Sequence, residues 1–342
     1  MDVREMEQRL ATFIARQVGV ETVSVSGLRR LAGGASREIW SVDVRYRQDG
    51  SEVALPLVLR RDPSAAAVGA MRRDEFELLR AAATEGVPVP KVYWLGDDPA
   101  TLGAPFFLMD RIEGETIARR LLRDDAYAEA RRLMTAQLGR IAAAIHRIDR
   151  VKHRLTFLTE PPPDESPAQG ELDRYEQIFR AIAPDPHPVF ELAFRWLRQR
   201  LPHGNERVVV HGDYRIGNVI FGPEGVRAVL DWELAHVGDP MEDLGWLCVR
   251  SWRFGSDDKP VGGIGMREEL FDAYRAAGGG DVDPLRVRFW EVLGNLKWGI
   301  MTIMQAKTYL DGLVQSVELA SLGRRTVEME LELLNLMETE AS

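Results

Sequence analysis

Cysteine is almost absent from this chain of 342 residues, which contains Cys248 alone. A single cysteine excludes a disulfide within the chain and any zinc site built from several cysteines. It also fits a reducing compartment, so we expect a cytoplasmic protein.

Long apolar runs are missing as well. The N-terminus is charged from its second residue and lacks the continuous apolar run of a signal peptide. Nowhere do about 18 apolar residues follow one another, so the sequence predicts no membrane span.

Positive charge is in deficit, because 44 Lys and Arg residues face 53 Asp and Glu residues, for a net charge of −9. This balance argues against a nucleic-acid partner. To bind a polyanion, such a chain would need local cations, and magnesium is the obvious one.

The hydrophobic pattern changes near residue 110. Before it, apolar spacing predicts a helix over 2–18, β-like runs from about 23 to 60, a second helix at about 64–84 and strands at 92–95 and 105–109. After it the pattern is mostly helical, and Asp283-Pro284 opens a helix over 284–310. We therefore expect a two-lobed α+β protein. Residues 1–110 form a five-stranded antiparallel sheet with one internal helix, and residues 111–342 form a larger helical lobe.

The most informative stretch is VVVHGDYRIGNVIFGPEGVRAVLDWELAHVGDPMEDLGWL, residues 208–247. Two short β runs, 219–221 and 226–230, are joined by Gly-Pro-Glu-Gly, which is a hairpin signal. In a hairpin the start of the first strand lies beside the end of the second. Asn218 and Asp231 are therefore brought together, with Asp213 in the adjoining loop.

Two carboxylates and one amide are all oxygen donors, which suits magnesium better than zinc. A plainer interpretation is that Asp213 and Asn218 make loop hydrogen bonds while Asp231 ends a strand, since Asp and Asn are common in turns. All three together, each beside a buried β run, favour a site.

These motifs resemble those of the aminoglycoside phosphotransferase and choline kinase family, which has a protein-kinase-like fold. HGDYRIGN resembles the catalytic loop, with the Asp-to-Asn spacing of the kinase pattern H-R-D-x-x-x-x-N, and LDWE resembles the metal-binding motif. The resemblance implies that Asp213 orients or deprotonates an acceptor hydroxyl. It also implies that Asn218 and Asp231 hold Mg²⁺ against the phosphates of ATP or GTP.

Upstream segments extend the resemblance. LAGGASREIW resembles the loop that covers the nucleotide phosphates, which places Gly33, Gly34, Ala35 and Ser36 there. LVLRRD resembles the strand that presents a nucleotide-binding lysine, but Arg60 stands at that position. Arginine there resembles a branch of the family associated with acyl-CoA dehydrogenases. FFLMDRIEG resembles the hinge, so the backbone from Asp110 to Ile112 would meet the base.

Glu75 lies within an apolar stripe on the second predicted helix, with Leu78, Leu79 and Ala82. A carboxylate in such a stripe needs a buried cation, and Arg60 is the natural partner. The resemblance gives this pair a nucleotide-binding role. The alternative is that Glu75 lies at the edge of the stripe and reaches solvent.

Several other residues have supporting roles by the same resemblance. Asp243 would brace the catalytic loop, while Arg215 and Glu233 would support the site or touch substrate. Glu233 could equally be a solvated neighbour. We expect His211 to pack and hydrogen-bond under the loop, and Asp239 to cap a helix in a capping box with Glu242. We expect His146 to have a structural role, and Trp246 and Trp252 to form part of the core or of a pocket wall. Residues 256–265 are predicted to form a flexible surface loop.

The resemblance implies phosphorylation of a hydroxyl on a small molecule. The stretch from 230 to 247 looks closest to the branch associated with acyl-CoA dehydrogenases, which favours a hydroxyacyl-CoA-like acceptor over an aminoglycoside-like one. Residues 151–205 and 250–282 are predicted to shape the acceptor pocket.

Three alternatives are weaker. Arg60 allows a catalytically silent nucleotide-binding module. A metal-dependent phosphohydrolase has no use for the glycine loop or the Arg60–Glu75 pair. A protein kinase would need an activation segment that is missing after Asp231.

Overall fold

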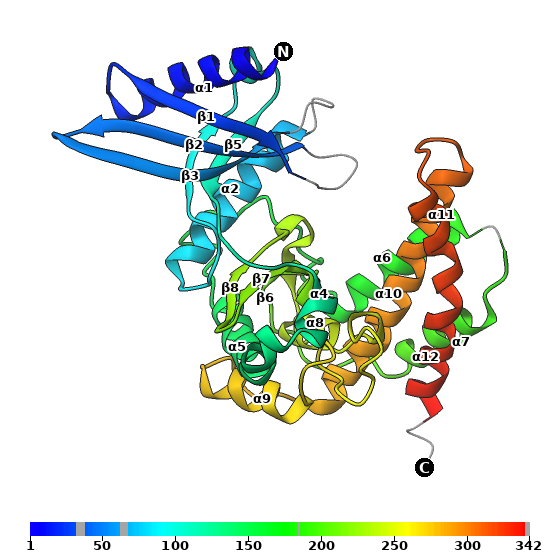
Figure 1. Ribbon diagram of the computed structural model, residues 1–342. Helices are drawn as coiled ribbons and strands as arrows, with labels where there is room; N and C mark the ends of the chain where they lie inside the picture. The colour runs from blue at the N-terminus through cyan, green and yellow to red at the C-terminus, as the bar shows by residue number, and fades with distance from the viewer. Residues whose placement is uncertain (32–37, 62–67, 184, 339–342) are drawn as a thin grey trace. The chain divides into compact units, whose positions relative to one another are not determined.

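The computed structural model describes residues 1–31, 38–61, 68–183 and 185–338 (Figure 1). They divide into two compact units, which are described one at a time. Unit 1 comprises Met1–Glu115, Arg150–Phe157 and Arg227–Glu233, and unit 2 comprises Thr116–Asp149, Leu158–Val226 and Leu234–Ser342. No helix in the described part of the chain is long and apolar enough to cross a membrane.

Unit 1 is built on a five-stranded antiparallel sheet with strand order β1-β2-β3-β5-β4, as predicted. The β2–β3 hairpin turns at Asp49 and Gly50, whose φ values of 50° and 77° are typical of tight hairpin turns. The elements are α1 (Val3–Val18), β1 (Val23–Arg30), β2 (Glu38–Gln48), β3 (Ser51–Arg61), α2 (Val68–Thr84), β4 (Val92–Gly96), α3 (Pro99–Leu102) and β5 (Phe106–Asp110).

The core of unit 1 lies between α1 and the sheet. Helix α1 begins at its cap Asp2 and runs beside β1 (Figure 1). Leu10 and Ile14 are fully buried with Leu57 and Leu59 of β3. The helical spacing of α1 and the alternation of β3 therefore place their apolar faces against each other.

Unit 2 is mostly helical. Its helices are α4 (Ala118–Arg123), α5 (Ala128–His146), α6 (Pro167–Ile182), α7 (Pro188–Arg198), α8 (Pro240–Leu247), α9 (Arg267–Ala276), α10 (Pro284–Leu310), α11 (Val317–Leu322) and α12 (Thr326–Glu338). Strand β6 (Val208–Val210) pairs with β9 (His236–Gly238). Strand β7 (Val219–Gly222) forms the predicted hairpin with β8 (Gly225–Val229), whose residues from Arg227 onward belong to unit 1. Short 3-10 helices are η1 (Asp125–Tyr127), η2 (Ile216–Asn218), η4 (Arg250–Trp252) and η5 (Gly323–Arg325), with η3 (Trp232–Leu234) at the unit boundary.

Helix α10 is the central support of unit 2 and has the predicted bounds. Asp283 caps it by accepting a hydrogen bond from Leu285 N at 2.9 Å, and Pro284 occupies its first position. The helix packs against α6, α8 and α12, and it runs beside α12 in Figure 1. This packing places residues of α8 and α10 against the loop that follows β6.

The expectation of a surface loop at 256–265 is wrong for its second half. Residues from Pro260 to Gly265 are buried, and Val261 is fully inaccessible. Gly262 and Gly263 have φ values of 55° and 76°, and a Cβ at Gly263 would lie 2.6 Å from Arg253 O. The glycines therefore allow a tight inward turn rather than marking mobility.

Candidate functional site

Asp213 lies in the loop after β6, and three side chains donate hydrogen bonds to its carboxylate. Its Oδ2 accepts a hydrogen bond from Asn218 Nδ2 at 2.6 Å. Its Oδ1 accepts from Trp246 Nε1 at 2.7 Å and from Arg215 Nε at 3.0 Å. Asp213 and Asn218 are thus brought together as expected, whereas the donor role of Trp246 was missed by sequence reasoning.

Asn218 directs its amide nitrogen at Asp213 alone. Nδ2 donates to Asp213 O at 3.0 Å as well as to the carboxylate. Within the described residues, Oδ1 of Asn218 has no hydrogen bond. This oxygen is a suitable ligand for a hard cation.

Asp243, at the start of α8, braces the same loop from beneath. Its two oxygens accept hydrogen bonds from His211 N at 2.8 Å and Gly212 N at 3.0 Å, and His146 Nε2 lies at 3.1 Å. Burial favours a higher pKa for Asp243, but the His146 contact and the nearby His211 hold its pKa below the usual range. The contacts expected of Asp243 and the burial expected of His211 are present.

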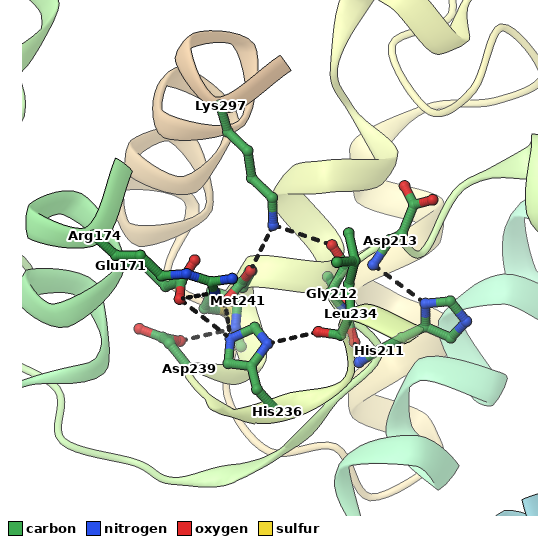
Figure 2. Close-up of polar contacts among 12 residues, drawn as sticks. Glu171, Arg174, His211, Gly212, Asp213, Leu234, His236, Asp239, Met241 and Lys297 are labelled. Carbon is green, nitrogen blue, oxygen red and sulfur yellow. Dashed lines mark hydrogen bonds and ion pairs between the residues drawn. The ribbon is translucent and has the colours of Figure 1, made fainter. Parts of the chain in front are cut away.

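A group of buried charges lies beside this loop and was not predicted. Figure 2 shows Glu171 of α6, His236 of β9 and Lys297 of α10. Glu242 of α8 contacts both His236 and Lys297 and lies close to Glu171. We call Glu171, His236, Glu242 and Lys297 the buried cluster. Glu171 and Lys297 each lie among apolar residues at helical spacing. Both are therefore charged side chains within apolar stripes, the same pattern that predicted a buried partner for Glu75.

The capping box predicted for α8 does not form. Asp239 caps the helix by accepting from Met241 N at 2.8 Å. The Glu242 side chain instead contacts His236 Nε2 at 3.1 Å and Lys297 Nζ at 3.4 Å. Because Glu242 is buried, two cationic partners stabilise it better than one backbone amide could.

The buried cluster contacts the loop after β6 through Lys297. Its Nζ donates to Gly212 O at 3.1 Å and lies 4.8 Å from the centre of the Trp246 ring. Burial opposes charge on both cations, yet Tyr175 and the carboxylates of Glu242 and Glu171 raise the pKa of Lys297, and Glu242 raises the pKa of His236 to about 9. Gly212 O therefore accepts its hydrogen bond from a charged ammonium group, that of Lys297.

In unit 1, Arg60 and Glu75 form a buried ion pair, so Glu75 does not reach solvent. Arg72, which sequence reasoning missed, binds the other oxygen of Glu75. Asp231 lies 4.0 Å from Arg60 and has a φ of 65°, an uncommon backbone conformation for a non-glycine residue. Glu233, in the same unit, is exposed.

The predicted hinge has two of its three amides already occupied. Asp110 N donates to Lys91 O and Arg111 N donates to Pro56 O. Ile112 N makes no hydrogen bond to any described residue. The predicted phosphate loop, Gly33, Gly34, Ala35 and Ser36, lies outside the described residues.

Comparisons with known proteins bear on this arrangement. The model of the phosphotransferase enzyme family, APH, matches residues 28–290. Acyl-CoA dehydrogenase family member 10 of Mus musculus is 29% identical over 282 residues, covering 78% of this chain but 25% of that protein. The probable acyl-CoA dehydrogenase IBR3 of Arabidopsis thaliana is 29% identical over 228 residues, covering 60% of this chain and 27% of that protein. The chain thus spans about a quarter of the length of each of these relatives.

Solved structures share the fold. A Ralstonia eutropha protein provisionally named an aminoglycoside phosphotransferase superposes with a TM-score of 0.78 at 23% identity, over 97% of this chain and 98% of its own. A choline/ethanolamine kinase family protein from Mesorhizobium loti gives a TM-score of 0.60 at 20% identity, over 96% and 95%. These neighbours show a kinase-like fold, and with the match over residues 28–290 the chain belongs to the phosphotransferase enzyme family APH.

Proposed function

We propose that the chain is a small-molecule kinase that transfers the γ-phosphate of ATP or GTP to a hydroxyl group. The observation that carries this proposal is the Asp213 carboxylate, held by Asn218, Trp246 and Arg215 in a loop braced by Asp243. Positioning and charge neutralisation are most of what phosphoryl transfer requires of a protein.

On the nucleotide side, the proposal uses Arg60 and Ile112 of unit 1. Arg60, oriented by Glu75, would contact the phosphates, and Ile112 N would donate to the base. Gly33 to Ser36 would cover the phosphates. A structural neighbour, aminoglycoside 2'-phosphotransferase-IIIa, was solved as a GDP complex, which supports a purine nucleotide as the second substrate.

Asn218 and Asp231 would hold magnesium. The fit rests on their oxygens, since Asn218 Nδ2 is committed to Asp213 and its Oδ1 is left for a ligand. When bound, the ion would neutralise charge that develops on the phosphates.

Asp213 would act on the acceptor. As the acceptor oxygen bonds to the γ-phosphorus, Asp213 takes up the hydroxyl proton, and the bond to the bridging oxygen breaks to release the nucleoside diphosphate. The hydrogen bonds from Trp246 and Arg215 keep one carboxylate oxygen in place during this transfer.

For the acceptor, we favour a hydroxyacyl-CoA-like metabolite. The support is the similarity to two proteins named for acyl-CoA dehydrogenases, although this chain spans only about a quarter of each. An aminoglycoside-like compound is the alternative, because a protein of the same fold is named for aminoglycoside phosphotransfer.

The test measures ADP or GDP release with Mg²⁺ across hydroxyacyl-CoAs, choline and aminoglycosides. Acceptor-dependent release should fall by about 10²–10⁴-fold in Asp213→Asn. The matched control Asp258→Asn, at an exposed aspartate, should behave as wild type. Nucleotide binding with no turnover on any acceptor would favour a silent module, and no nucleotide binding at all would overturn the proposal.

A further inference from the structure

Three potential metal ligands surround one point in unit 2, and none of them is a residue assigned to phosphoryl transfer. Glu171, His236 and Glu242 come from α6, β9 and α8, and all three are buried. Each offers one ligand atom, and these atoms lie within 4.8 Å of one another. One metal ion bound by all three residues would fit such a set.

His236 is oriented as a metal-binding imidazole. Its Nδ1 lies 2.9 Å from Leu234 O, to which it donates. That hydrogen bond turns Nε2 toward the carboxylates, at 3.1 Å from Glu242 Oε2 and 4.0 Å from Glu171 Oε1 (Figure 2). A backbone carbonyl that fixes one ring nitrogen while the other faces a site is the usual support of a histidine ligand.

The two carboxylates are supported in the same way. Arg174 donates to Glu171 Oε1 at 3.0 Å, and Lys297 donates to Glu242 Oε1 at 3.4 Å. The second oxygen of Glu171, Oε2, is buried and has no hydrogen-bond partner among the described residues. The single hydrogen on His236 Nε2 bonds to Glu242 and leaves Glu171 Oε2 without a hydrogen bond. A metal ion would bind both carboxylates.

The site also has room and access. A Cβ at Gly238 would lie 3.0 Å from His236 Nε2 and 3.2 Å from Glu242 Oε2, so glycine keeps that space open. Glu171, His236 and Gly238 line a cavity of about 890 Å³ beside α6. An ion could therefore enter, and one of its coordination positions would face the cavity.

We propose that Glu171, His236 and Glu242 bind a first-row transition-metal ion of the zinc type. One imidazole nitrogen and two carboxylate oxygens favour such an ion over magnesium, which prefers oxygen alone. The ion replaces the hydrogen on Nε2, while Arg174 continues to hold Glu171 Oε1 and Lys297 continues to hold Glu242 Oε1. This site shares no residue with the proposed magnesium site and does not depend on the proposed kinase activity.

The test uses the full chain, freed of metal with EDTA and titrated with Zn²⁺ and Co²⁺. Bound metal is measured by elemental analysis, and the Co²⁺ absorption spectrum reports the ligands. Wild type should bind one equivalent of Zn²⁺ at this site. Glu171→Gln and His236→Gln should each weaken binding by at least about 10–100-fold, since even supporting residues have effects of that size.

Two variants separate this site from other metal binding. His187→Gln removes another histidine–carboxylate pair of unit 2, and Asp231→Asn removes a proposed magnesium ligand. Both variants should still bind one equivalent of Zn²⁺. Binding that survives Glu171→Gln, or that disappears in Asp231→Asn, would overturn the proposal, as would no stoichiometric binding by wild type. Should His236→Gln fail to fold, Glu171→Gln decides, because it keeps the volume and an oxygen for Arg174.

Discussion

At the scale of single residues, the position of Asp213 depends on donors from different parts of unit 2. Asn218 and Arg215 belong to the same loop as Asp213, whereas Trp246 is contributed by α8. Trp246 therefore ties the orientation of the carboxylate to a helix rather than to the loop alone.

We expect Trp246→Phe to lower kcat about tenfold with little change in KM. The substitution keeps the aromatic ring but removes the N–H that donates to Asp213 Oδ1, and one hydrogen bond to a charged group is worth about 1.5–3 kcal/mol. Steady-state kinetics with the acceptor that the panel of hydroxyl compounds selects would measure the effect. Trp252→Phe is the matched control, since its Nε1 has no partner among the described residues. Equal losses in both variants would contradict a positioning role.

Arg60 and Arg72 share Glu75 but should differ in function. Arg60→Met should raise the KM for the nucleotide about 10–100-fold, because it removes the proposed phosphate contact. Glu75 would keep Arg72 as a partner, so the thermal midpoint should change little. Arg72→Met should leave the nucleotide KM nearly unchanged. Nucleotide titrations of both variants would show whether Arg60 alone carries the effect.

At the scale of elements, α8 joins the catalytic loop to α10. It contributes Glu242, Asp243 and Trp246, and it packs closely on α10. Gly245 permits this approach, because a Cβ there would lie 2.6 Å from Trp290 Cβ. The loop is therefore positioned by a helix contact that tolerates no added side chain.

Gly245→Ala should lower the free energy of unfolding by about 1–3 kcal/mol, the usual cost of forcing an extra methyl group into a packed contact. Denaturant titration would measure it. Gly170→Ala in α6 is the comparison, since its Cβ would meet Pro161 Cβ at 3.1 Å, at a loop residue. That variant should be neutral or slightly stabilised, because alanine favours helix. A stable Gly245→Ala would show that α8 and α10 can separate without loss.

At the scale of the whole molecule, we expect acid to lower the stability that Asp243 contributes by binding the loop after β6. The pKa of Asp243 is lower in the folded chain than in an unfolded one. Its contribution to stability is therefore complete above pH about 4 and is lost as pH falls through the lower folded value.

The measurement is the thermal midpoint of wild type and Asp243→Asn between pH 7 and pH 3. Wild type should be the more stable at neutral pH, because Asn can accept only one of the two backbone hydrogen bonds. The difference should shrink toward pH 3. A constant difference across this range would show that the charge of Asp243 does not contribute.

Much of the architecture could be predicted because local patterns depend on neighbours in sequence. The bounds of α10 follow from Asp283-Pro284 and a helical repeat, and the β7–β8 hairpin follows from its turn. The Arg60–Glu75 pair was predicted for a related reason, since a carboxylate in an apolar stripe requires a cation. The lobe boundary near residue 110 and the roles of the site residues stay predictions.

The sequence by itself determined the fold class and the loop containing Asp213 and Asn218, because spacing and turn residues act over a few positions. Tertiary structure alone decided that Trp246 donates to Asp213, that Glu242 turns from its helix cap to His236 and Lys297, and that residues from Pro260 to Gly265 are buried. Those outcomes depend on which groups distant segments bring together. A buried polar group takes the partner that packing supplies, and spacing along the chain does not encode that choice.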